Sequence, residues 1–254
     1  MTEFDSQSFE AEDVQRLDNV LSETTAPVTR KALLTRAAAG TAAVGALGAL
    51  GPIPAAFAKS SGNSIQAIIN DAVTAEALAV TYLTGLIENA HATGVTEFVS
   101  VLKAANESEY DHFKALRSLG AKPLTEKFWA PDAFFKPGQP FAVLEFAETQ
   151  FVNAYLIAIT AFAKAHKDNL ARYAGEILGV EAQHLALARF AQKKLPNNIG
   201  FAEYKTHTIG GIVGNLEKAG IGFGKQGKGP GKFYHFPGRP PASTLTPLRS
   251  HKPA

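Results

Sequence analysis

Two Glu-x-x-His motifs, Glu109–His112 and Glu181–His184, lie 72 positions apart in this 254-residue chain. Each motif follows another glutamate at one fixed distance, because 33 positions separate Glu76 from Glu109 and also Glu148 from Glu181. Residues three apart on a helix point the same way, so each motif places a carboxylate and an imidazole side by side. A third motif, Glu88–His91, has no matching upstream glutamate and we regard it as chance. The doubled spacing indicates one structural unit used twice.

Apolar residues recur at alternating steps of three and four over four segments, which predicts helices at about 65–91, 96–119, 141–166 and 170–191. Residues 121–140 contain four prolines and cannot continue a helix. The connections therefore run short, long, short, which is typical of a four-helix bundle with one long crossover between its second and third helices. We expect an all-α fold.

All six residues of the doubled pattern fall on the apolar stripes of these helices. Unpaired buried carboxylates cost several kcal/mol each, so a neutralising partner is required. Two divalent cations balance four carboxylates, and two neutral imidazoles complete a two-metal site. Mixed oxygen and nitrogen ligands suit two Fe or two Mn ions, with Zn²⁺ also compatible. The predicted ligands are Glu76, Glu109, His112, Glu148, Glu181 and His184.

Within this set, the repeat predicts that Glu109 and Glu181 bridge both metals, while Glu76 and Glu148 each bind one. Glu145 is an alternative to Glu148, but it lies off the stripe and we interpret it as a solvated or supporting acid. Tyr155 lies two turns from Glu148 on the same face. It is either a redox relay or a core residue with a satisfied hydroxyl.

The pattern Glu76, Glu109-Tyr110-Asp111-His112, Glu148 and Glu181-Ala182-Gln183-His184 resembles the ferritin-like superfamily. It is most similar to exported bacterial ferritin-like domain proteins of the desiccation-related type, over residues 64–192. The resemblance implies a di-metal site that handles dioxygen or hydrogen peroxide, as in ferritins, rubrerythrins and manganese catalases. Many di-iron relatives carry aspartate immediately before the glutamate of the motif, where this chain has Ser108 and Val180.

The resulting functional hypothesis is ferroxidase, peroxidase or catalase-like chemistry in protection against oxidative or desiccation stress. The competing hypothesis is a non-enzymatic envelope or stress protein that uses the surface of its bundle to bind partners. A homo-oligomer is compatible with either. The net charge of only +2 gives no reason to expect nucleic acid. The absence of cysteine excludes disulfides, thiolate metal ligands and a cysteine nucleophile.

Residues 1–58 have the order expected of a signal peptide: the basic pair Arg30-Lys31, then 22 uncharged residues from Ala37 to Ala58 that end in Ala-Phe-Ala. The segment resembles a twin-arginine signal, with Lys31 in place of the second arginine. We therefore expect export to the periplasm or the extracellular space. The alternative is an uncleaved N-terminus that anchors the protein to the membrane.

Residues 193–254 read as an irregular, basic extension rich in glycine and proline. From Leu195 onward it carries eight Lys or Arg residues against two acids, Glu203 and Glu217. One short helix is expected at about 209–218, and we expect residues 233–237 to lie on the bundle surface. Contact with the cell envelope through this extension is a further hypothesis.

Overall fold

The computed structural model describes residues 63–241. The predicted signal peptide at 1–58 therefore lies outside the described residues, and export remains a prediction.

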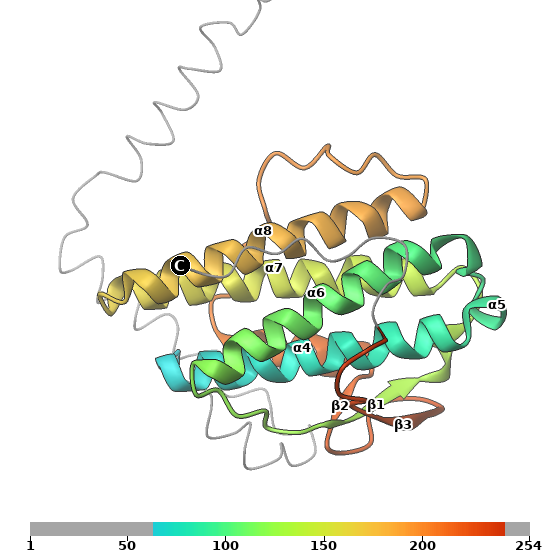
Figure 1. The fold of residues 1–254 in the computed structure, drawn as a ribbon, viewed down its shortest axis with the longest axis horizontal. Coiled ribbons are helices and arrows are strands. Elements are labelled where there is room, and N and C mark those ends of the chain that lie inside the picture. The colour runs from blue at the N-terminus through green and yellow to red at the C-terminus, as the bar shows by residue number, and fades with distance from the viewer. Residues whose placement is uncertain (1–62, 242–254) are drawn as a thin grey trace, which may run out of the picture. The chain divides into compact units, whose positions relative to one another are not determined.

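Four long helices dominate the described part of the chain (Figure 1). They are α4 (Ile65–Glu88), α6 (Val99–Ser118), α7 (Pro140–Lys164) and α8 (Asp168–Ala191). Helix α4 packs along α6, α7 packs along α8, and the two pairs meet mainly through α4 and α7. The four predicted helices are confirmed, with ends within a few residues of those expected.

Local signals in the sequence account for the helix boundaries. The Ser64 hydroxyl caps α4 by accepting a hydrogen bond from the amide of Ala67. Pro140 occupies the first turn of α7, where its missing N–H costs nothing. The α4–α6 connection holds the short helices α5 (Ala90–Thr93) and η2 (Thr96–Phe98). It turns at Gly94, whose φ of 75° favours glycine.

A small antiparallel sheet joins the long crossover to the C-terminal part of the chain. The crossover contains β1 (Lys127–Pro131) and the 3₁₀ helix η3 (Asp132–Phe135). Strand β1 lies between β2 (Gly222–Phe223) and β3 (Gly231–His235) and pairs antiparallel with both. The expected all-α fold is therefore incomplete, since the protein is mostly helical with a three-stranded sheet.

The prediction of an irregular extension holds only in part, because β2 and β3 lie within residues 193–241, and the short helix expected there is present as α9 (Ile209–Ala219). Glycines that read as loop signals instead allow the backbone to approach closely. A Cβ on Gly231 would lie 2.4 Å from the carbonyl oxygen of Ala130, and one on Gly227 would lie 2.0 Å from that of Gly220.

The C-terminal elements share the apolar core of the bundle. Phe128 of β1, Phe223 of β2 and Leu216 of α9 are all buried in the same cluster as the helix side chains. Phe236, just after β3, packs its ring 4.6 Å from that of Phe113 on α6. Residues 233–237 thus lie against the bundle, as the sequence predicts.

Helix α7 is the one described helix that is long and apolar enough to cross a membrane. Half of its most apolar window is buried inside the protein, where it packs against α4 and α8. The same composition is expected of a central bundle helix, and this position explains it.

Candidate metal centre

The six residues of the doubled pattern converge inside the bundle from all four long helices. They form two overlapping groups. Each residue of a group offers one ligand atom, and these atoms all lie within 4.8 Å of one another. The first group is Glu76 of α4, Glu109 and His112 of α6, and Glu181 of α8. The second is Glu109, Glu148 of α7, Glu181 and His184 of α8. Glu109 and Glu181 belong to both groups.

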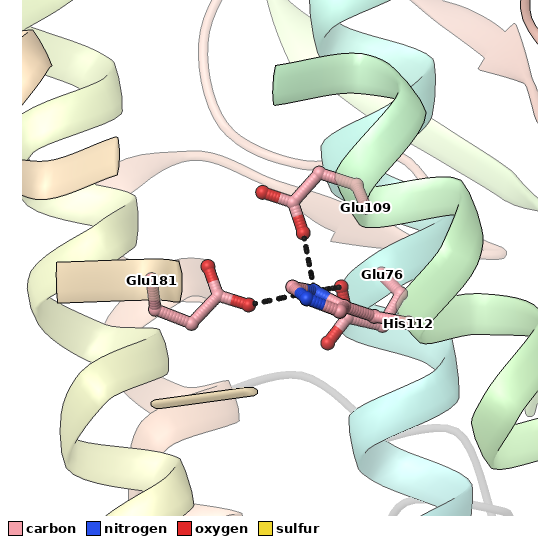
Figure 2. Close-up of side chains that lie close together, drawn as sticks. All are labelled: Glu76, Glu109, His112 and Glu181. Atoms are coloured by element: carbon pink, nitrogen blue, oxygen red, sulfur yellow. Dashed lines mark hydrogen bonds and ion pairs between the residues drawn. The ribbon is translucent and has the colours of Figure 1, made fainter. Parts of the chain in front are cut away.

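His112 lies at the middle of the first group, with its Nδ1 atom directed at three carboxylates (Figure 2). Nδ1 is 3.2 Å from Glu109 Oε2, 3.3 Å from Glu181 Oε1 and 3.5 Å from Glu76 Oε2. A single imidazole nitrogen therefore faces carboxylates from three different helices.

His184 has the equivalent position in the second group. Its Nδ1 atom is 2.7 Å from Glu109 Oε1 and 3.7 Å from Glu181 Oε2. The two oxygens of Glu109 are thus divided between the histidines, with Oε2 near His112 and Oε1 near His184. Glu181 is divided in the same way. The local arrangement has the two-fold character that the repeat predicts.

The four carboxylates of the cluster are buried. Glu109 and Glu181 are 0% exposed, Glu76 is 2% and Glu148 is 3% exposed. Many of its polar atoms nevertheless lack a hydrogen-bond partner within the described chain, a costly arrangement for buried groups. These atoms are Glu76 Oε2, Glu109 Oε1, Glu148 Oε2, both carboxylate oxygens of Glu181, and His184 Nδ1. These oxygens and the ring nitrogen face one another at one centre without well-aligned hydrogen bonds, an arrangement that can bind metal ions.

The environment divides the four carboxyl groups into two classes. Burial raises the pKa of Glu76 and of Glu148 well above the ordinary value, and the negative charges of Glu181 and Glu109 add to this effect. Burial also acts to raise the pKa of Glu109 and Glu181, but the facing imidazoles outweigh it and the net shift is downward. Without metal, these shifts favour the ionised form of Glu109 and Glu181 and the protonated form of Glu76 and Glu148.

The carboxylates of Glu109 and Glu181 raise the pKa of both histidines. Burial alone lowers an imidazole pKa, yet the contacts with Glu109 and Glu181 outweigh it at both positions. The pKa of His184 rises to about 10, and that of His112 rises well above its ordinary value. Without metal, these shifts favour imidazolium forms that pair with the carboxylates of Glu109 and Glu181.

Tyr155 makes a contact that the sequence did not indicate. Its buried hydroxyl donates a hydrogen bond to Glu76 Oε1, from α7 to α4. Burial raises the pKa of this phenol, and the neighbouring Glu76 carboxyl raises it further. Tyr155 therefore touches a predicted ligand directly, whereas sequence reasoning related it only to Glu148 on its own helix.

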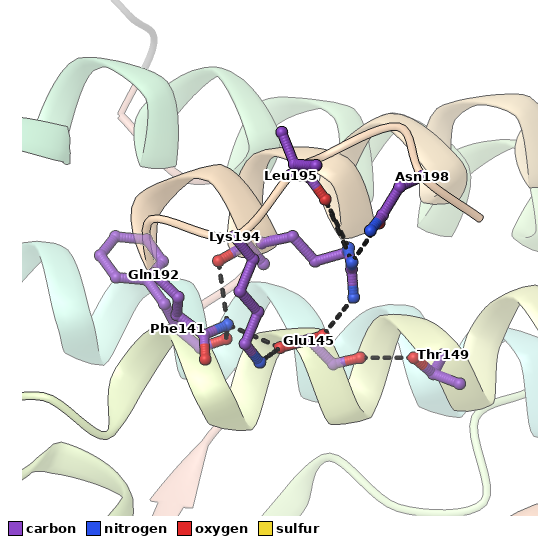
Figure 3. A network of polar contacts seen from close by, with 9 residues as sticks. Phe141, Glu145, Thr149, Gln192, Lys194, Leu195 and Asn198 are labelled. Carbon is purple, nitrogen blue, oxygen red and sulfur yellow. Dashed lines mark hydrogen bonds and ion pairs between the residues drawn. The ribbon is translucent and has the colours of Figure 1, made fainter.

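Glu145 lies outside the cluster, so the choice of Glu148 agrees with the geometry. Its carboxylate accepts hydrogen bonds from Arg189 and Gln192 at 2.8 Å and pairs with Lys194 (Figure 3). Arg189 also donates to the carbonyl oxygen of Leu195. Glu145 thus fixes the end of α8 and the chain after it to α7, and these donors lower its pKa against the opposing effect of burial.

The third Glu-x-x-His motif, and Ser108 beside the first one, take no part in the cluster. Glu88 and His91 are exposed near the end of α4, as expected for a chance match. The hydroxyl of Ser108, the residue before Glu109, donates a hydrogen bond to the carbonyl oxygen of Ala104 on its own helix and does not reach a cluster residue through this bond.

Comparison with protein-family models, with curated proteins and with solved structures gave no match. The fold and the site by themselves define a helical protein with a buried cluster of carboxylates and histidines suited to two metal ions.

Proposed function

We propose that this chain is a ferritin-like di-metal carboxylate protein that reacts with dioxygen or hydrogen peroxide. The observation that carries the proposal is the buried cluster of four carboxylates and two imidazoles, in which several polar atoms lack a well-aligned hydrogen bond. Such a cluster is unfavourable in an apolar interior unless cations complete it.

The residues fit two metal ions. Glu76 and His112 would hold one ion, Glu148 and His184 the other, and Glu109 and Glu181 would bridge both because each belongs to both groups. Two divalent cations carry the four positive charges that four carboxylates require. The oxygen-rich ligand set with two imidazoles favours Fe or Mn, with Zn²⁺ also compatible.

When bound, a pair of Fe or Mn ions supplies the electron-transfer chemistry needed to reduce dioxygen or to convert peroxide. The protein's own residues position the ligands and exclude water. The Tyr155 hydroxyl orients the Glu76 carboxyl through a hydrogen bond, and this contact places a phenol beside the site where it can act as a redox relay. We infer a role in oxidative or desiccation stress from the resemblance of residues 64–192 to exported ferritin-like proteins.

Metal content tests this proposal. The mature chain, purified from its native host without added metal, is expected to contain about two Fe or Mn ions, the number that this ligand set holds. The double variant Glu109→Ala/Glu181→Ala should lose both. The matched control Glu145→Ala removes a carboxylate from the same bundle and should keep both. A folded protein without metal from the native host would contradict the proposal.

Activity assays of the metal-loaded protein then distinguish the candidate reactions. Catalase-like chemistry predicts oxygen evolution from hydrogen peroxide without a reductant, whereas ferroxidase or peroxidase chemistry requires an electron donor such as Fe²⁺. Metal loading without either reaction would identify a structural centre.

The second candidate is a non-enzymatic partner-binding protein, and a separate observation favours it. The segment after α8 exposes large apolar side chains: Leu195 is 66%, Ile199 46% and Phe201 88% exposed. Exposed apolar side chains in one segment are typical of interaction sites. A metal-free chain that forms a stable complex through this segment would support the second candidate.

A further inference from the structure

A cavity of about 120 Å³ lies beside the metal centre. Two of its lining residues, Glu148 and His184, belong to the second group of the cluster. Every other lining side chain is apolar, including Leu102, Ala105 and Leu144 from α6 and α7. The cavity therefore combines apolar walls with polar groups contributed only by the candidate metal ligands.

The cavity reaches the protein surface through apolar side chains. Val101 of α6 and Leu187 and Phe190 of α8 line it, and they are 40%, 44% and 62% exposed. A large ring such as that of Phe190 left in water at the entrance of an apolar cavity is typical of a binding site for an apolar ligand. Hydrogen peroxide would require no such rim, and apolar walls offer it no hydrogen bonds.

Size narrows the class of ligand. An apolar protein cavity of roughly 150 Å³ remains dry and binds benzene or xenon. The present cavity is slightly smaller at about 120 Å³, enough for a short alkyl chain or a small ring, and its open rim extends the available length. Dioxygen is much smaller than the space provided.

We propose that this cavity binds the apolar part of an organic co-substrate, an alkyl or aryl group of about the size of benzene, next to Glu148 and His184. This inference rests on the di-metal function proposed above and names the class of its second substrate. The apolar walls fix the organic group, and the polar end of the cavity faces the metal ligands.

The test is a titration of the full chain with toluene, followed by calorimetry and by ligand-observed NMR. Saturable binding is expected. Ala105→Leu adds bulk inside the cavity and should weaken toluene binding at least tenfold. The matched control Ala171→Leu adds the same atoms to a half-buried alanine of α8 that does not line the cavity, and should leave binding unchanged.

A rim variant keeps the test valid if Ala105→Leu fails to fold. Leu187→Asp places a charge on a side chain that is 44% exposed, so folding should tolerate it, while toluene binding should fall at least tenfold. Xenon binding without toluene binding would show a gas cavity only and overturn the inference. Toluene binding unaffected by both variants would place the ligand elsewhere and overturn it equally.

Metal analysis of the same samples separates this inference from the proposed function. Two metal ions per chain with no toluene binding would leave the di-metal function standing and reject the organic co-substrate. Toluene binding by a native chain that never contains metal would reject the di-metal function, and with it the role of co-substrate.

Discussion

The hydroxyl of Tyr155 on α7 donates a hydrogen bond to the carboxyl group of Glu76 on α4, across the boundary between the two helix pairs. Both residues are buried, at 5% and 2% exposure. A hydrogen bond in such surroundings orients the carboxyl group and joins the helix pairs at the level of the candidate metal centre. Tyr155 therefore belongs to the site, whether or not it takes part in electron transfer.

Replacing Tyr155 with phenylalanine removes the donor and leaves a buried carboxyl oxygen without its partner. The free energy of unfolding of the metal-free protein should fall by about 1–3 kcal/mol in urea denaturation. Tyr204→Phe is the control, because Tyr204 is 39% exposed and lies outside the cluster. Equal stability of the two variants would show that the contact contributes nothing. Intact metal loading with a slower reaction in Tyr155→Phe would support the redox relay.

The ligand cluster could be predicted from the sequence because the spacing of residues along one helix determines which side chains share a face. Glu109 and His112 must share a face wherever their helix packs, and the repeat gave them a second copy in Glu181 and His184. The same periodicity separated Glu148 from Glu145. The structure places Glu148 in the cluster and Glu145 in a part-buried network with Arg189.

Contacts between distant segments could not be predicted in this way. Phe128 pairs with Tyr234 in the sheet, but nothing near either residue indicates the other. The pairing depends on glycines that allow close backbone approach, and in the sequence these resemble loop residues. The partner of Tyr155 and the cavity beside His184 likewise depend on how the helix pairs pack.

Each histidine should be required for two-metal loading. His112→Ala and His184→Ala each remove the only imidazole of one group, so each variant should bind at most about one ion per chain. The measurement is elemental analysis of the folded variants. His207→Ala is the control, because His207 lies in the segment between α8 and α9. Two ions per chain in both single variants would reject the ligand assignment.

Glu148 and Glu145 provide a matched pair on one helix. Glu148→Gln should reduce metal content, whereas Glu145→Gln should leave it unchanged. Glu145 is a half-buried partner of Arg189 and Lys194, and the loss of its charge should cost about 1–3 kcal/mol of stability because hydrogen bonds to a charged group are weakened. Metal analysis and urea denaturation of both variants test this. A metal deficit in Glu145→Gln would indicate that the wrong carboxylate was chosen.

The metal-free protein should lose stability as the pH rises from about 6.5 to about 10. The folded pKa of His184 is raised to about 10, so the folded state binds more protons than the unfolded state across this window. Stability must then fall with pH, by about 1.4 kcal/mol per pH unit for each proton released. The raised pKa values of His112, Glu76 and Glu148 act in the same direction.

Urea denaturation at several pH values measures this dependence, and His184→Gln should flatten it.

Glu109 and Glu181 should affect the stability of the metal-free protein at acidic pH. The lowered pKa values of Glu109 and Glu181 contribute stability that is present above their ordinary value of 4.5 and is lost as the pH falls through their folded values. A metal-free protein whose stability is constant between pH 6.5 and 10 would exclude protonated histidines in the cluster.

Metal loading should release protons, because metal ions and protons compete for the same atoms. Burial raises the pKa of Glu76 and Glu148, and the facing carboxylates raise the pKa of His112 and His184, so the metal-free cluster holds protons more tightly than free side chains do. Binding two divalent ions should therefore release protons, and the apparent affinity should rise with pH. Calorimetry in two buffers of different ionisation enthalpy gives the number released. A cluster that binds two ions without releasing protons would have to be ionised beforehand, which its burial disfavours.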